Sequence, residues 1–393
     1  MEPTKEQLSA KLIASAIIPL VVLGAMVAFL LWPGNGLLNI GIPLPDVTIE
    51  RVEFLDGRIV AYVRNTGPQA VEIAQADVND RILPAAIEPS KSLERLAEAK
   101  VVIPFQWIEG QPYEIGVTTS DGTRFAKAVA AAAPTPQPDA GRVSLFALLG
   151  TYVGVIPVLI GLLWYTFIRR LSQPKYSFFL SLTAGLLMFL GIDALVEANE
   201  ISIESVAGAF RGQLLIATAA IVSFLALMYV SDRLVDGSAK RRVVQGSFAI
   251  ALMVAIGIGL HNLGEGLAIG GAMVVGEVAL STFLIVGFTL HNTTEGLAIV
   301  APIAKDRPKI SYLVALGIIA GAPAIAGTWI GGFVASPVAS IVFLAIGAGA
   351  VFQVVVVIGR FIGHSSGGRF LTGPTAAGLA AGMLIMYLTT LLI

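Results

Sequence analysis

Long apolar segments separated by short polar ones make up most of the chain. A helix needs about 20 apolar residues to cross a bilayer, and nine segments have about this length. The pattern therefore predicts nine transmembrane helices. They lie near residues 10–32, 144–168, 177–198, 212–231, 245–270, 278–303, 310–333, 338–360 and 372–393.

The region between the first two apolar segments has a different pattern. Residues 44–128 alternate apolar and polar positions in short runs such as VTIERVEFL and RIVAYVRN, which is typical of strands with one buried face. Turn signals separate the runs; they are Asp56-Gly57, Asn65-Thr66-Gly67 and Asp121-Gly122. We expect a small β-sandwich-like domain with a structural or partner-docking role, followed by a Pro/Ala linker over 129–142.

The first apolar segment begins beside Lys5 and Lys11, as a signal peptide would. The apolar core of a signal peptide spans only about 7–15 residues and ends at a small-residue cleavage site. This segment is longer, and no such cleavage site follows it. We therefore predict an uncleaved N-terminal transmembrane anchor over residues 1–32.

Composition agrees with a membrane location. The 393 residues are 56% hydrophobic and 13% charged, whereas soluble domains carry roughly 25% charged residues. The net charge of −1 gives no sign of the excess positive charge that is typical of nucleic-acid-binding proteins. Cysteine is absent, which excludes disulfides and thiolate metal sites. Any metal must therefore bind to His, Asn, Asp, Glu or backbone oxygen.

Basic residues predict the orientation of the helices. Cytoplasmic loops of membrane proteins carry an excess of Lys and Arg. Here the basic residues fall in alternate loops, with Arg211 as the exception. We therefore place the N-terminus and these loops in the cytoplasm of a plasma-membrane protein, with the β domain and the C-terminus outside. The loop residues are Arg169, Arg170, Lys175, Arg233, Lys240, Arg241, Arg242, Lys305, Arg307, Lys309, Arg360 and Arg369.

Two near-identical stretches place polar groups inside apolar segments. HNLGEGLAIG begins at residue 261 and HNTTEGLAIV at residue 291. Residues three and four apart share one face of a helix, and the short connection near 276–277 makes the two helices antiparallel neighbours. Gly266 and Gly296 would allow either a close approach of helices or a bend of the backbone there. The converging set consists of His261, Asn262, Glu265, His291, Asn292 and Glu295.

A divalent cation explains this polar set best. A charged side chain in mid-bilayer costs at least about 2.5–3.5 kcal/mol, and a bound cation offsets that cost by neutralising the carboxylates. Imidazole nitrogen and carboxylate oxygen suit Zn²⁺, Fe²⁺ and Mn²⁺. Hydrogen-bonded core histidines, a His/Glu proton relay and a bis-histidine haem are the alternatives, while the metalloprotease motif His-Glu-x-x-His is absent. His364, in HSSGG, is expected to be a solvated loop residue.

At these residues the chain resembles the ZIP (Zrt/Irt-like) family of divalent metal transporters, whose members carry similar His-Asn-x-x-Glu-Gly motifs on their fourth and fifth helices. The resemblance covers roughly residues 143–393 and extends to TAGLLMFLGIDALVEANE on the second family helix. It implies an eight-helix ZIP-like metal transport domain. The whole chain would then be an all-α polytopic membrane protein with an added N-terminal anchor and β domain.

The resemblance also implies roles for the motif residues. The four His and Glu side chains would be primary metal ligands between the fourth and fifth helices, and the two asparagines would lie at a second, adjacent metal position. The chain departs from the family pattern in the sixth helix, where Ala322 replaces a carboxylate before Pro323. In the seventh helix only Gln353 takes the place of the usual His and Glu ligands. These departures favour a single bound metal.

We therefore expect a transporter of a divalent transition metal, zinc first and iron or manganese next, and not an enzyme. The ion would approach past Glu277, Asp193 and Glu197 at the outer rim. The alternative is a membrane metal-binding sensor or scaffold that acts through its β domain. The expected partners are the metal ion and the lipid bilayer, without nucleic acid or a prosthetic group; a homodimer and a protein partner of the β domain stay open.

Overall fold

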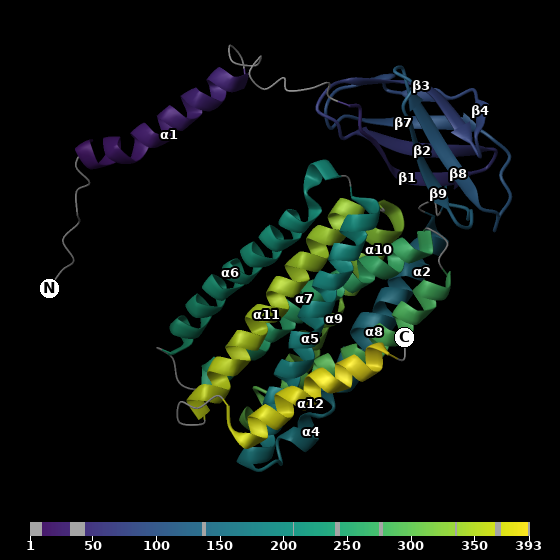
Figure 1. Cartoon of the computed structure of the whole chain (residues 1–393). Coiled ribbons are helices and arrows are strands. Elements are labelled where there is room, and N and C mark those ends of the chain that lie inside the picture. Colours follow the sequence, from purple (N-terminus) through teal and green to yellow (C-terminus); the bar gives the residue numbers. More distant parts are fainter. Residues whose placement is uncertain are drawn as a thin grey trace.

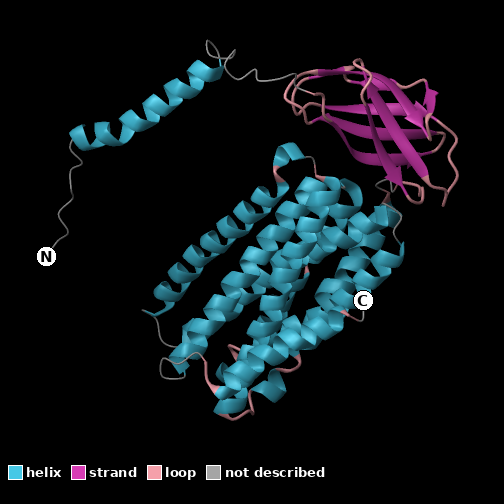
Figure 2. Ribbon diagram, in the orientation of Figure 1, coloured by secondary structure: helices cyan, strands magenta, loops and turns pink. Residues whose placement is uncertain are grey.

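The chain forms an apolar helix, a β domain and a helical bundle, in that order (Figures 1 and 2). The structure is a computed structural model that describes residues 10–31, 44–135, 139–206, 208–239, 244–274, 278–334, 336–365 and 371–391. Within these ranges, six helical stretches are long and apolar enough to cross a membrane. The chain is therefore a polytopic membrane protein with a small β domain.

A helix lies in each of the nine predicted apolar segments. The six stretches long and apolar enough to cross a membrane, among the described residues, are Ala140–Ile168, Gln173–Ile203, Gly208–Arg233, Ser247–Met273, Ile310–Val334 and Pro337–Gly363. The count of eight bundle helices and the predicted domain boundaries stay predictions. The helices are α1 Ala10–Leu31, α2 Ala140–Gly150, α3 Ile156–Leu162, α4 Tyr165–Ile168, α5 Gln173–Ser205, α6 Gly212–Ala239, α7 Val244–Val274, α8 Val278–Val300, α9 Ile310–Gly321, α10 Pro323–Val334, α11 Pro337–Ser365 and α12 Gly373–Thr390.

Two irregular helical turns lie in contact with each other. α2 passes into α3 through a π turn, η2 (Thr151–Val155). The predicted span 310–333 divides into α9 and α10 before Pro323, which has no amide hydrogen to donate to the preceding turn. Gly154 and Gly321 pack together, since a Cβ on Gly154 would lie 2.4 Å from the Gly321 oxygen. Irregular turns of this kind leave backbone carbonyls available to other partners.

The β domain consists of two packed antiparallel sheets. One has the strand order β1-β2-β7-β5, and the other has β4-β3-β8-β9 with β6 paired to β3. Alternate side chains of both sheets point inward and form one apolar core, as the alternating sequence pattern predicts. The strands are β1 Val47–Leu55, β2 Arg58–Asn65, β3 Val71–Val78, β4 Arg81–Leu83, β5 Ala86–Glu88, β6 Ser92–Leu93, β7 Glu98–Pro104, β8 Tyr113–Thr119 and β9 Arg124–Val129.

Two of the three predicted turns close hairpins. The turns at 56–57 and 121–122 join β1 to β2 and β8 to β9. The third predicted turn instead carries the chain from β2 into β3 of the other sheet. There the Asn65 side chain accepts the Gly67 amide at 3.0 Å and donates to the Leu93 carbonyl at 2.8 Å. This turn is a corner between sheets, stabilised by one buried amide.

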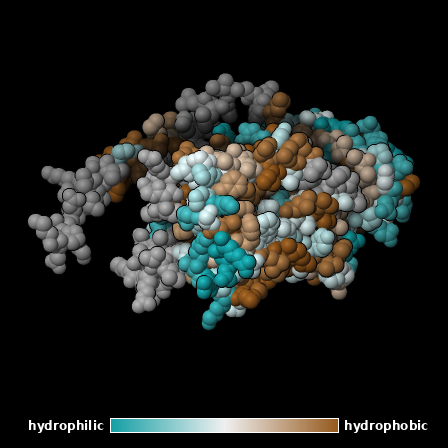
Figure 3. Space-filling model, turned by 90° about the horizontal axis from the view of Figure 1, so that it is seen from below, coloured by the Kyte–Doolittle hydropathy of each residue, from teal (hydrophilic) through white to brown (hydrophobic). Residues whose placement is uncertain are grey.

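The described parts of the loops predicted to be cytoplasmic lie at the end of the bundle away from the β domain (Figure 1). Lys240, Arg241, Arg242 and Arg369 lie outside the described residues. Lys305 Nζ donates to the carbonyls of Arg169 and Leu171 at 3.2 and 2.6 Å. Arg360 pairs with Asp232 at 2.9 Å. Seen from this end, a hydrophilic patch is bordered by hydrophobic surface (Figure 3). The charge pattern therefore marks one end of the bundle, while its side of the membrane stays a prediction.

The expectation for His364 is wrong. α11 continues to Ser365, so His364 lies in its last turn and not in a loop. The helix extends beyond the predicted end because Ile362 is fully buried and prolongs the packed face by one turn.

Glycines let the motif helices pack backbone to backbone on their neighbours. A Cβ on Gly266 of α7 would lie 2.2 Å from the Ala324 oxygen of α10. A Cβ on Gly296 of α8 would lie 2.3 Å from the Val158 oxygen of α3. Both distances are far below van der Waals contact, so only glycine permits this spacing. Of the two roles expected for these glycines, the structure shows the close approach of helices.

Gly270 and Gly271 of α7 offer a matched test of this packing. A Cβ on Gly270 would meet the Thr328 oxygen at 2.5 Å, whereas one on Gly271 would meet nothing within 4 Å. Alanine favours a helix over glycine by about 0.5–1 kcal/mol at either position, but overpacking at Gly270 costs about 1–3 kcal/mol. Thermal unfolding in detergent should show a lower midpoint for Gly270→Ala and an unchanged or higher one for Gly271→Ala. Equal midpoints would contradict the close contact.

Candidate metal centre

The two motifs lie in the interior of the bundle on neighbouring helices. His261 and Glu265 are midway along α7, and His291 and Glu295 are on α8, which packs beside it. All six predicted site residues are buried, with no more than 7% of any of them exposed. The interior placement removes water from side chains that are normally solvated, so their contacts with one another decide what the site can do.

Glu265 makes most of these contacts, with side chains of both helices. Its Oε1 lies 3.1 Å from His261 Nε2 and is hydrogen-bonded to His291 Nε2. Its Oε2 accepts a hydrogen bond from Asn292 Nδ2 at 2.9 Å. One carboxylate therefore draws together side chains from both helices. The ligand atoms of His261, Glu265 and His291 all lie within 4.8 Å of one another, a spacing that suits one shared metal ion.

Backbone carbonyls at the two irregular turns hold the asparagines. Asn292 Nδ2 also donates to the Val153 carbonyl of the π turn at 3.1 Å. Asn262 Nδ2 donates to the Ala320 carbonyl at 3.1 Å, just before the helix break at Pro323. Sequence reasoning missed both carbonyls. Two prolines are signals that could have pointed to them. Pro157 has no N–H for the Val153 carbonyl four residues before it, and Pro323 breaks the helix beside Ala320.

Several buried polar atoms of the site have no hydrogen-bond partner among the described residues. They include His261 Nδ1, Asn262 Oδ1, Asn292 Oδ1 and both carboxylate oxygens of Glu295. Buried polar atoms are hydrogen-bonded in about 90% of cases or more, and leaving one unpartnered costs roughly 1–3 kcal/mol. This concentration of unpartnered lone pairs indicates a bound species that accepts electron pairs, such as a metal cation.

Glu295 lies outside the close group of three ligands, although it is 1% exposed and therefore just as buried. The positions where the resemblance places further ligands add nothing to the group. Ala322 caps the end of α9, and Gln353 is fully buried on α11 with neither amide atom bonded. The described side chains therefore form one compact site rather than two.

Acidic side chains on α5 lie within electrostatic range of this site. Asp193 is exposed and Glu197 is partly exposed. Asp193 interacts electrostatically with His261 and His291, and Glu197 with His261. Glu277, the third acidic residue predicted on the access route, lies outside the described residues. The α5 carboxylates extend negative charge from the site toward the β-domain end of the bundle.

Comparisons with known proteins do not assign a family. No family model matches the chain, and no curated protein matches it. Among solved structures, the archaellum periplasmic stator protein FlaG from Sulfolobus acidocaldarius is similar to part of it, with 19% identity and a TM-score of 0.19. That match covers 22% of this chain and 99% of the other. A TM-score this low establishes neither a shared fold nor a shared function, so the resemblance to the ZIP family stays a prediction.

The different contacts of the two glutamates predict different effects of removing them. Glu265→Ala leaves buried donors on His291 and Asn292 without an acceptor, at roughly 1–3 kcal/mol each, so it should lower the thermal midpoint of the metal-free protein. Glu295→Ala removes a carboxylate without hydrogen bonds and should leave the midpoint unchanged or raise it. Both variants should weaken metal binding in equilibrium dialysis. A large loss of metal-free stability in Glu295→Ala would contradict the contacts described here.

Proposed function

We propose that the chain transports a divalent transition metal ion across the plasma membrane, as a protein of the ZIP type with an eight-helix transport domain. The observation that carries the proposal is the buried group of His261, Glu265 and His291 on two neighbouring helices at mid-bundle. Transporters hold their cargo halfway along such helices. We expect zinc first and iron or manganese next, since imidazole and carboxylate suit all three.

The contacts at the site favour a cation over haem or a proton relay. Glu265 Oε1 lies against both imidazoles, so a carboxylate fills the space that a porphyrin plane would need between two axial histidines. A proton relay through His and Glu gives no role to the unpartnered oxygens of Asn262 and Asn292. A divalent cation uses nitrogen, carboxylate and amide oxygen together.

A difference between the two sides of the site supports transport over fixed binding. Toward the β domain, Asp193 and Glu197 offer carboxylates to an arriving cation. Toward the opposite end, a cluster of apolar side chains that includes Leu187, Ile258 and Leu297 fills the interior. We infer that the ion arrives from the β-domain side, which we take as the outside of the cell, and stays at the site until this apolar cluster opens.

Binding exchanges one set of contacts for another. The ion takes up the imidazole nitrogens and the Glu265 carboxylate, which otherwise contact each other. Metal ligands must be deprotonated, so ion binding displaces protons from these groups. Release toward the cytoplasm requires one group of helices to rock against another, as in other secondary transporters.

Glu265→Ala should abolish saturable metal uptake into proteoliposomes that hold the purified protein, because it removes the group that the other ligands contact. The wild-type protein should take up at least one ion from a panel of Zn²⁺, Fe²⁺, Mn²⁺ and Cd²⁺. Glu109→Ala changes an exposed carboxylate of the β domain and should keep wild-type uptake.

Wild-type uptake in Glu265→Ala would refute the site. If no ion is taken up while metal still binds, the protein is a membrane sensor or scaffold, and the β domain is its working part.

Asp193→Asn and Glu197→Gln should each raise the ion concentration for half-maximal uptake severalfold, with little change in the maximal rate. The reason is that these carboxylates attract the cation without being its final ligands. The effect should shrink at high ionic strength because salt screens exposed charges. An unchanged half-saturating concentration for both variants at low ionic strength would remove these residues from the route.

A further inference from the structure

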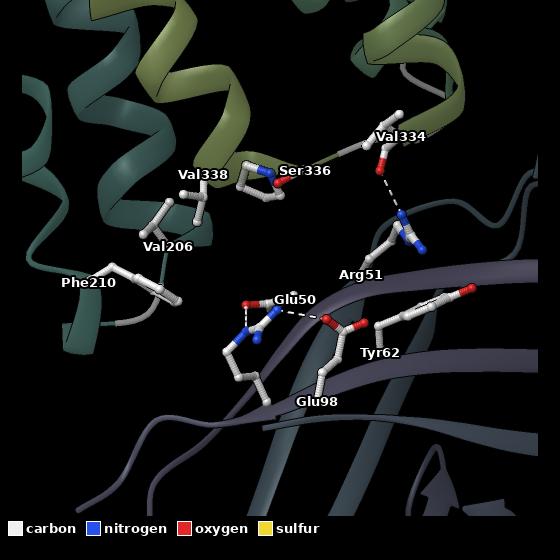
Figure 4. A pocket seen from close by; sticks show the side chains of 11 residues that line it. Glu50, Arg51, Tyr62, Glu98, Val206, Phe210, Val334, Ser336 and Val338 are labelled. Carbon is white, nitrogen blue, oxygen red and sulfur yellow. Dashed lines mark hydrogen bonds and ion pairs between the residues drawn. The ribbon is translucent and has the colours of Figure 1, made fainter. Parts of the chain in front are cut away.

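The outer face of the β1-β2-β7-β5 sheet is turned toward the ends of the bundle helices (Figure 4). Strand β1 contains a bulge, seen as a register shift between Ile49 and Arg51. A bulge re-aims side chains because it adds one residue to the alternation. Ile49 and Phe54 remain in the core, while Glu50 and Arg51 both lie on the outer face and line the space beneath the helices.

Arg51 makes the first contact with the bundle. Its Nη1 donates to the carbonyl of Val334, the last residue of α10, at 2.7 Å. The last carbonyls of a helix lack partners within the helix, and a cation there also interacts favourably with the helix dipole. Glu53, at 3.2 Å, and the Tyr62 ring, at 3.9 Å from its centroid, hold the guanidinium in place.

Arg64 makes the second contact. Its guanidinium carbon lies 5.9 Å from the ring centroid of Phe210, in the short helix η3 (Gly208–Phe210) that joins α5 to α6. Glu50 and Glu98 fix Arg64 through hydrogen bonds of 2.6 and 2.7 Å. A cavity of about 430 Å³ is lined by residues of both contacts (Figure 4). The β domain therefore contacts the bundle at two helix ends that border one cavity.

These two helix ends belong to different tightly packed pairs. α10 packs backbone to backbone on α7 at Gly266, next to Glu265 of the metal centre. η3 follows α5, which carries Asp193 and packs as closely on α12, where a Cβ on Gly185 would lie 2.2 Å from the Leu379 oxygen. The β domain thus holds one end of each pair.

We propose that the β domain is a brace that ties the α7–α10 pair to the α5–α12 pair at their outer ends and thereby limits the rate of their relative movement. The inference rests on the proposed transport function. A relative movement of the pairs changes the distance between Val334 and Phe210, so the two arginine contacts cannot both persist through it. The brace slows this step without touching the metal.

Arg51→Met tests the brace, because it removes the hydrogen bond to Val334 and keeps an apolar stem over Tyr62. Maximal uptake in proteoliposomes should rise severalfold, with an unchanged half-saturating concentration. Arg81→Met, on exposed strand β4 of the other sheet, is the matched control and should behave as the wild type. Unchanged or lower maximal uptake in Arg51→Met would overturn the proposal.

A reversible cross-link tests the same idea in the opposite direction. The chain contains no cysteine, and Glu98 and Ser336 line the cavity from the β domain and from the helix ends. In the double variant Glu98→Cys, Ser336→Cys, a reducible bifunctional thiol reagent should suppress uptake severalfold, and reduction should restore it. Full uptake with the link intact would overturn the brace.

Spin labels on these two cysteines distinguish failure of the brace from failure of transport. The label-to-label distance distribution should broaden when Arg51→Met is added and stay unchanged with Arg81→Met. If the wild-type protein takes up no ion, transport is refuted and the distance distribution alone decides whether the two parts are tied. An unchanged distribution in Arg51→Met would overturn the tie.

Discussion

The burial of one carboxylate, Glu265, determines the arrangement of the bundle centre. An isolated carboxylate in an apolar interior is strongly unfavourable, so donors must surround it. His291 and Asn292 supply them from α8, and His261 lies on its own helix. These contacts fix the register of α7 against α8. The glycine after each glutamate then lets α10 and α3 approach to backbone contact, so the candidate metal centre and the close helix packing depend on adjacent residues.

Much of this arrangement could be predicted from the sequence, because each helix that spans a bilayer needs about 20 apolar residues. Apolar length marks the helices, and the repeat of His-Asn-x-x-Glu-Gly at matching depth marks six residues that share the bundle interior. Local alternation also marks the β strands. These signals are strong because each depends on residues close together in the chain.

The features that the sequence did not predict depend on contacts between distant parts of the chain. The carbonyls of Val153 and Ala320 become partners of the asparagines only because a π turn and a helix break lie beside the motifs. The residues from Asn65 to Gly67 have the local pattern of a hairpin turn, which would pair β2 with β3. The two strands instead belong to different sheets. The contact of Arg51 with Val334 joins residues 283 positions apart, which no local pattern encodes.

The two glutamates of the motifs differ in a way that suits a site that must be stable both with and without a cation. Glu265 contacts His261 and His291 and accepts a hydrogen bond from Asn292, so its carboxylate has partners when no cation is bound. Glu295 and the amide oxygens have no such partners and supply lone pairs that a cation can use. Ion binding therefore replaces the internal contacts of Glu265 with an external one and gives the Glu295 oxygens a partner that they otherwise lack. A transport site at mid-bundle has to meet this condition while its helices move, and a brace at the outer ends can control that movement without disturbing it.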